Sequence, residues 1–85
     1  MTRNDIFYER LCQVVCQEFP RSELPITQSV IASQVTGWDS LGHNRLIIAI
    51  ENEFKVKLPL VESLYVDSVR QLGELLLATL ENQNG

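Results

Sequence analysis

The sequence predicts an all-α fold, a four-helix bundle with three main helices, one short helix and a long loop between the first and second helices. Three segments repeat apolar residues at the spacing of an amphipathic helix, and prolines or capping residues separate them. A single short segment alternates like a strand, and no second strand exists to pair with it. With 85 residues, the chain is expected to form one domain (1–85) around one modest core, ordered over about residues 3–81.

The first helix is predicted from about Thr2 to Phe19, and Pro20 ends it. Its buried stripe consists of Phe7, Leu11, Val14 and Val15. The loop that follows, up to Asp39, has no sustained period. A loop of this length needs anchoring. The apolar residues expected to pin it over the bundle are Leu24, Ile26, Val30, Ile31 and Val35.

The helical period returns over residues 40–54 and predicts the second main helix. Its buried stripe is Leu46, Ile47, Ile50 and Phe54. We expect residues 55–58 to form an extended connector and residues 59–64 to form the short helix, which opens with a proline. The last helix begins at Asp67 or Ser68, where Ser68 and Gln71 match a capping box. Its buried face is Val69, Leu72, Leu76 and Leu80.

Composition and charge exclude several classes of function. The formal net charge is −4 and the seven Lys and Arg residues are scattered, so the chain lacks the clustered bases of a nucleic-acid-binding protein. The chain starts with polar residues rather than a signal peptide, and its longest apolar stretch is too short to span a bilayer, which predicts a cytoplasmic protein without membrane insertion. Cys12 and Cys16 lack the further ligands of a metal site, and we interpret them as small apolar residues of the first helix.

The segment most informative about function is residues 37–42, GWDSLG, where the loop turns into the second helix. Asp39 is a good N-cap, because its carboxylate can accept hydrogen bonds from the unpaired N–H groups of the first turn. Ser40 then takes the first helical position, at the positive end of the helix dipole. Free amides would stabilise a phosphodiester attached to its hydroxyl. Spacing alone leaves open that this Asp-Ser pair is only a helix cap.

Asp-Ser-Leu at residues 39–41, followed by LIIAIENEF at residues 46–54, resembles the acyl carrier protein family. The hallmark of that family is Asp-Ser-Leu opening a helix that ends in an acidic run and Phe. Pro59 after a short connector, the brief third helix and the helix start at residues 68–69 look similar to its second half. The resemblance is specific over about residues 35–77 and general in layout elsewhere.

The resemblance implies an acyl-carrier-like four-helix bundle in which Ser40 receives phosphopantetheine from coenzyme A through a phosphopantetheinyl transferase. Asp39 would cap the helix beside the attachment site. The thiol of the arm would carry an acyl group, as a thioester, between enzymes that load it and enzymes that use it. The protein itself would be a non-catalytic, monomeric carrier without a metal, serving a fatty-acid, polyketide or other specialised pathway.

Three residues of the second helix are predicted to face partner enzymes. Leu41 and Ile48 lie off the buried stripe, and Leu41 adjoins the serine. Arg45 is a cation near a helix N-terminus, where positive charge is mildly unfavourable. We expect Arg45 to favour partners with an acidic group opposite it, and a solvated arginine without a partner is the alternative. Residues 42–45 also differ from the acidic and branched residues that fatty-acid carriers often place there, which favours a stand-alone member of a specialised pathway.

Two other functions could use the same residues. Asp39, Ser40 and His43 are the ingredients of a hydrolase triad, but Asp39 adjoins Ser40 and the G-x-S-x-G elbow is missing. We therefore expect His43 to be a half-exposed surface residue and Trp38 to be a partly buried anchor of the loop. The chain could instead be an acidic helical interaction or inhibitor protein without a prosthetic group. For such a protein, three carboxylates against one arginine over residues 39–54 make a thin acidic patch.

Overall fold

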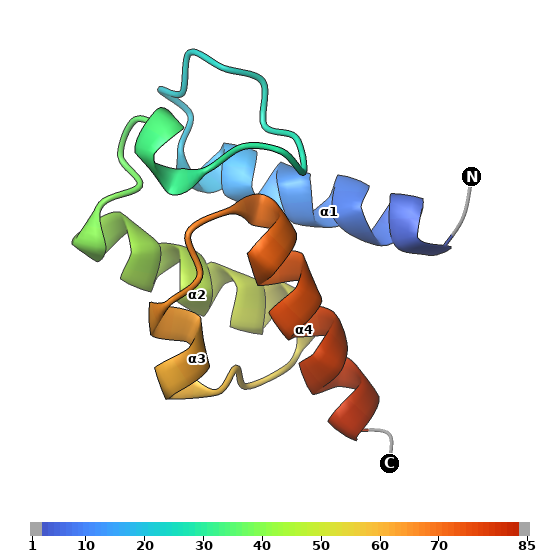
Figure 1. Cartoon of the computed structure of the whole chain (residues 1–85). Helices are drawn as coiled ribbons and strands as arrows, with labels where there is room; N and C mark the ends of the chain where they lie inside the picture. Colours follow the sequence, from blue (N-terminus) through green and yellow to red (C-terminus); the bar gives the residue numbers. More distant parts are fainter. Residues whose placement is uncertain (1–2, 84–85) are drawn as a thin grey trace.

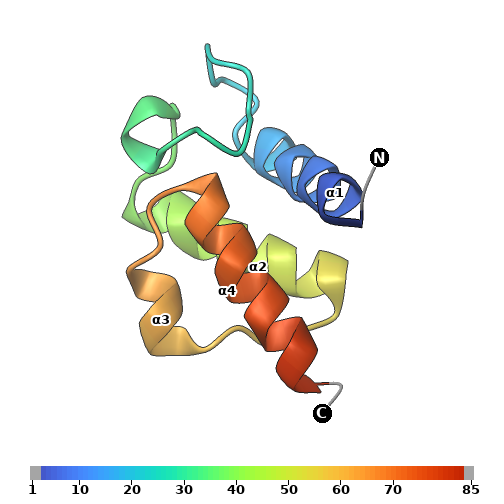
Figure 2. The same cartoon turned by 45° about the vertical axis from the view of Figure 1, so that its right-hand side comes forward.

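The computed structural model describes residues 3–83, which form four α-helices and one short 3-10 turn. These elements are α1 (Arg3–Glu18), η1 (Ala32–Gln34), α2 (Ser40–Phe54), α3 (Leu60–Leu64) and α4 (Val69–Gln83). Figures 1 and 2 show α4 crossing α2, with α1 and α3 on opposite sides of this pair. The predicted four-helix bundle with one short helix is confirmed. The predicted start of the first helix at Thr2 lies outside the described residues.

The core lies where α1 packs against α2 and α4. Seven side chains are the largest that are fully buried: Leu11, Val15, Leu46, Ile50, Val69, Leu72 and Leu76. All seven belong to the predicted buried stripes, because the helical period places them on the inner faces. Their burial away from water contributes to the hydrophobic stabilisation of the fold.

The inner face of α1 differs from the prediction at two neighbouring positions. Tyr8 is buried and Phe7 is only half-buried. Gly73 of α4 explains the exchange, because a Cβ there would overlap the Tyr8 ring, so the glycine lets the ring lie against the α4 backbone. Burial raises the pKa of the Tyr8 hydroxyl. Phe7 packs instead beside Phe54, with ring centroids 5.6 Å apart. Three further residues of the predicted stripes are also only half-buried: Ile47, Phe54 and Leu80.

The long loop between α1 and α2 is tied to the start of α4 by main-chain hydrogen bonds. The N–H of Ala32 donates to the carbonyl oxygen of Asp67 at 2.7 Å, and the N–H of Val69 donates to the carbonyl oxygen of Val30 at 3.1 Å. The turn η1 begins at Ala32, and no pattern in the sequence predicted it. The loop is therefore anchored to the bundle, as its length required.

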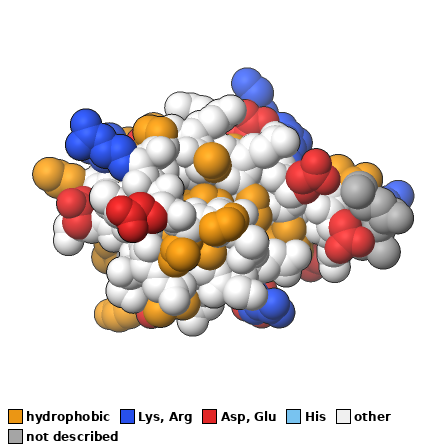
Figure 3. All heavy atoms as spheres, turned by 90° about the horizontal axis from the view of Figure 1, so that it is seen from above, with side chains coloured by type: hydrophobic (Ala, Val, Ile, Leu, Met, Phe, Trp, Pro, Cys, Tyr) orange, Lys and Arg blue, Asp and Glu red, His pale blue; other side chains and the backbone are white. Residues whose placement is uncertain are grey.

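The apolar residues of the loop differ in how far they are buried. Val30 and Val35 are buried, as predicted, and Ile26 is partly buried. The prediction was wrong for Leu24 and Ile31, which are 45% and 43% exposed. Successive side chains of an extended segment point to opposite sides, so the burial of Val30 turns Ile31 outward. The first part of the loop, which contains Leu24, rises away from the helices (Figure 1). Figure 3 looks onto this face and shows apolar side chains at its centre among charged ones.

The predicted connector over residues 55–58 is non-helical, but its first residue is not extended. Lys55 ends α2 in the left-handed conformation, with φ 57°. Val56 and Leu58 then point into the core and are buried. The N–H of Leu58 donates to a carboxylate oxygen of Glu51 at 2.8 Å, which holds the connector against α2.

The start of α4 has most of the predicted capping box. The hydroxyl of Ser68 accepts from the N–H of Gln71 at 3.1 Å. The side chain of Gln71 reaches back to the N–H of Asp67 at 3.0 Å, one residue earlier than the motif requires.

None of the described helices is both long and apolar enough to cross a bilayer.

Candidate functional site

Ser40 is the first residue of α2, and its side chain is exposed. Asp39 precedes it in an extended conformation, and its carboxylate accepts from the N–H of Gly42 at 2.8 Å. The predicted N-cap and helix start are therefore confirmed in geometry. The first N–H groups of a helix have no partner within the helix, and together with the dipole they favour a negative group at this end. A phosphodiester on the Ser40 hydroxyl fits these surroundings.

Two glycines allow the loop to pack closely against the start of α2. Gly37 has φ +95°, which favours a residue without a Cβ. A Cβ on Gly42 would overlap the carbonyl oxygen of Gly37 and would lie 3.0 Å from the Phe19 ring. Gly42 therefore permits the close approach that positions Ser40. Gly42, which differs from the residues that fatty-acid carriers often place there, therefore has a packing role in this structure.

Trp38 anchors the loop more deeply than predicted, with only 7% of its surface exposed. Its ring stacks on Phe19, with centroids 5.7 Å apart. Its Nε1–H donates to Nδ1 of His43 at 3.0 Å, and Nε2 of His43 lies 2.7 Å from the carbonyl oxygen of Ser63. Because the indole nitrogen can only donate, Nδ1 of His43 must accept, and the imidazole proton sits on Nε2, where it bonds to Ser63.

These hydrogen bonds contradict the hydrolase arrangement. The carboxylate of Asp39 binds the N–H of Gly42 rather than the imidazole. Both ring nitrogens of His43 already have other partners, so neither is positioned to take a proton from Ser40. His43 is half-buried, close to its prediction as a half-exposed surface residue, but spacing alone did not reveal its two partners.

The residues predicted to face partners lie on an exposed apolar surface. Leu41 is 73% exposed and Ile48 is 57% exposed. The contribution of α3 and of Tyr65, which directly follows it, was not predicted from the sequence. The exposed residues there are Leu60, Val61, Leu64 and Tyr65. A helix of only five residues with three large apolar side chains is a signal that could have found them, since so short a helix cannot bury all three.

Arg45 has an intramolecular partner that spacing did not predict. Its Nε lies 3.3 Å from a carboxylate oxygen of Glu18, at the end of α1. The acidic run of α2 is also engaged, since Glu53 pairs with Arg10 at 2.9 Å and Glu51 accepts from the connector. The charged side chains Arg45, Glu51 and Glu53 of α2 therefore all interact with other groups of the same molecule. No free acidic patch forms on this helix, which removes support from the inhibitor alternative.

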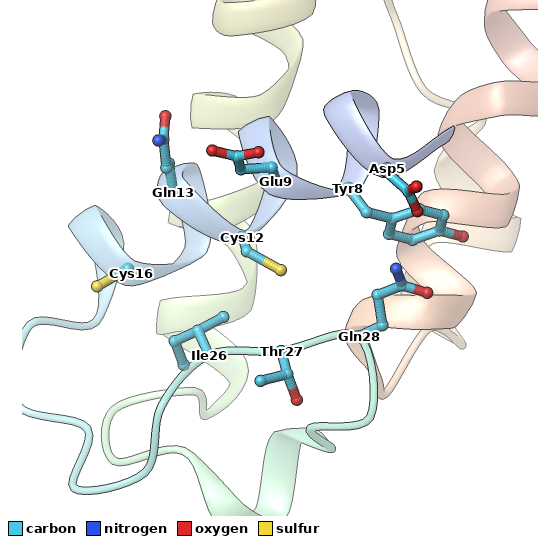
Figure 4. Close-up of a pocket in the computed structure, with 9 residues that line it drawn as sticks. All are labelled: Asp5, Tyr8, Glu9, Cys12, Gln13, Cys16, Ile26, Thr27 and Gln28. Carbon is cyan, nitrogen blue, oxygen red and sulfur yellow. The ribbon is translucent and has the colours of Figure 1, made fainter. Parts of the chain in front are cut away.

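Two of the hollows in the described structure are lined by different elements. A groove of about 450 Å³ runs between α2 and α3, with His43 and Ser63 in its lining. Another hollow, of about 470 Å³, lies between α1 and the long loop (Figure 4). Burial raises the pKa of the Cys12 thiol in this second hollow, while Cys16 is exposed and its sulfur points away. Within residues 3–83, no three His, Cys, Asp or Glu side chains gather as metal ligands.

Comparison with known proteins agrees with this architecture. The chain is similar to the solution structure of a holo acyl carrier protein from Geobacter metallireducens, with 27% sequence identity and a TM-score of 0.76. The similarity covers 91% of this chain and 88% of that one. No protein-family model and no curated protein matches the sequence. The chain therefore shares its four-helix fold with this acyl carrier protein over most of the length of both chains, in agreement with the resemblance to that family.

Proposed function

We propose that the protein is a non-catalytic carrier of acyl groups that is modified with phosphopantetheine at Ser40. The observation that carries this proposal is an exposed serine hydroxyl at the first position of α2, directly after an Asp N-cap, in a fold shared with a holo acyl carrier protein. When attached, the arm supplies a thiol that holds an acyl group as a thioester.

The residues around Ser40 present the serine and accommodate the charge of its phosphodiester. Asp39 fixes the helix start through the N–H of Gly42, which leaves the earlier N–H groups of the turn available to an anion. Trp38 and Gly42 hold the loop and the helix together beneath the exposed hydroxyl. The chain therefore offers a rigid attachment point without a catalytic group of its own.

The partners of this function are a phosphopantetheinyl transferase and the enzymes that load and use the acyl group. Leu41, Arg45 and Ile48 would meet them, together with the exposed residues of α3. The proposal includes carriers of fatty-acid, polyketide and other specialised biosynthetic pathways. Gly42, His43 and Arg45 each have internal contacts, so their departure from fatty-acid carriers no longer argues for one pathway.

The attachment is tested by incubating the protein with coenzyme A and a transferase of broad specificity, followed by intact-protein mass spectrometry. We expect one phosphopantetheine group on the parent protein and none on Ser40→Ala. Ser29→Ala is the matched control, because Ser29 is an exposed serine of the long loop, and it should be modified like the parent. A parent protein that gains no mass, or a Ser40→Ala protein that still gains it, contradicts the proposal.

The role of Arg45 in partner choice needs a separate test, because its ion pair with Glu18 gives it a structural role as well. Phosphopantetheine-loaded Arg45→Glu should be used faster than the parent by a housekeeping fatty-acid synthase enzyme, and the gain should shrink as salt rises. Glu18→Gln is the control, because it frees Arg45 without changing α2, and we expect it to be used no faster than the parent. Equal rates for all three proteins at low and moderate salt would leave Arg45 as ordinary surface charge.

A further inference from the structure

His43 joins three segments of the chain through its ring. The planes of the imidazole and of the Trp38 indole are 12° apart, and their centroids are 6.3 Å apart. With the hydrogen bond from Trp38 lying along the ring edges, the two rings meet side by side. On its other edge, Nε2 bonds to the carbonyl oxygen of Ser63, 20 residues away in α3. The imidazole thus links the loop before Ser40, the first turns of α2, and α3.

The helix that His43 reaches has little other burial. Within α3, Leu60, Val61 and Leu64 are 75%, 61% and 60% exposed. Ser63 alone is buried, and its hydroxyl bonds within the same turn, to the carbonyl oxygen of Leu60 at 2.8 Å. Contacts with α4 and the His43 hydrogen bond therefore hold α3 in place with few buried apolar side chains. Segments with so little buried apolar surface are those that open locally at low cost.

Both partners of the His43 hydrogen bond, His43 and Ser63, line the groove between α2 and α3. The groove is lined along α2 by His43, Asn44, Ile47, Ile48 and Glu51. Of these, His43 is nearest in sequence to Ser40, so an apolar chain attached at Ser40 would pass it before reaching Ile47 or Ile48. Any movement of α3 away from α2 must first break the bond between His43 and Ser63.

We propose that His43 is a positioning residue that holds α3 against the start of α2 and so sets the width of the groove beside Ser40. The part that concerns a chain attached at Ser40 rests on the proposed function. The part that concerns α3 does not, because it depends only on contacts within the unmodified protein.

The first test uses nuclear magnetic resonance on the unmodified protein. The imidazole should be neutral, with the proton on Nε2 and a bare Nδ1 that accepts from Trp38, which the two nitrogen chemical shifts report. A neutral ring with its proton on Nδ1 would overturn the proposal, because a bare Nε2 could not donate to the carbonyl oxygen of Ser63.

Three variants separate the two hydrogen bonds of the ring. His43→Phe keeps a flat ring and loses both bonds, His43→Asn keeps an acceptor near Trp38, and His43→Gln keeps a donor near Ser63. Amide hydrogen exchange at Ser63 and Tyr65 should be about tenfold faster in the Phe and Asn variants, as expected for loss of the partly buried hydrogen bond to Ser63. The Gln variant should stay near the parent. Unchanged exchange in the Phe variant, or equal acceleration in the core helices, would overturn the proposal.

The second test adds cargo. The parent and His43→Phe are loaded from octanoyl-coenzyme A by a transferase, and chemical-shift changes on loading are compared at Ile47, Ile48 and Leu64. We expect larger changes in the variant, because a released α3 lets the chain enter the groove more deeply. Equal changes would show that His43 does not set the groove width. If neither protein can be loaded, the proposed function fails, while the tautomer and exchange tests still decide the role of His43 in holding α3.

Discussion

The two sides of α2 are built differently. On the side facing α1 and α4, Leu46 and Ile50 are completely buried. On the side facing α3, a groove of about 450 Å³ remains, and the α3 residues Leu60 and Leu64 stay in solvent. Stability follows the apolar area removed from water, so the first side carries the fold and the second contributes little. A chain of this length can leave one side open because its fully buried side chains lie on α1, α2 and α4.

The sharpest test of this difference is a pair of truncations at leucines of similar size. Leu46→Ala should lower the free energy of unfolding by about 2–5 kcal/mol, because it leaves a cavity in a fully buried site. Leu64→Ala should change it by about 0.5 kcal/mol or less, because the side chain is already 60% exposed. Urea denaturation followed by circular dichroism measures both. Similar losses in the two variants would mean that α3 belongs to the core after all.

The next largest effect is expected at the junction between the two sides, where the loop rests on α2. Gly42→Ala should cost about 1–3 kcal/mol of stability, because the added Cβ meets the carbonyl oxygen of Gly37 and the loop must shift. Asn44→Ala lies on the same helix in an exposed position and should stay within about 0.5 kcal/mol of the parent. If Gly42→Ala is as stable as Asn44→Ala, the loop is not seated as tightly as the structure indicates.

The smallest expected effect separates the capping residue from the serine beside it. Asp39→Ala should cost roughly 1 kcal/mol through loss of the hydrogen bond to the N–H of Gly42, and Asp39→Asn should restore most of it. Ser40→Ala should leave thermal unfolding nearly unchanged, since the exposed hydroxyl contributes little to the fold. A clear loss of helical signal in Ser40→Ala would make the serine structural and would weaken its proposed role in attachment.

The sequence predicted those parts of the molecule that depend on local pattern. The period of 3.6 residues identified the inner faces of α1, α2 and α4, and the Asp-Ser pair identified the start of α2. Tyr8 was missed because its burial depends on Gly73 in a different helix. The bonds of His43 to Ser63 and of Arg45 to Glu18 were missed for the same reason. They join residues 20 and 27 positions apart, and no periodic pattern marks such pairs.

Trp38 is the single tryptophan of the chain, and it lies two residues before Ser40. Its indole is 7% exposed, stacks on Phe19 and donates a hydrogen bond to His43. The protein therefore contains an intrinsic fluorophore at the base of the candidate site, with no second tryptophan to obscure its signal. Its emission should respond when the imidazole contact is lost or when water reaches the indole. Changes at the start of α2 can thus be followed optically, in real time and without a label.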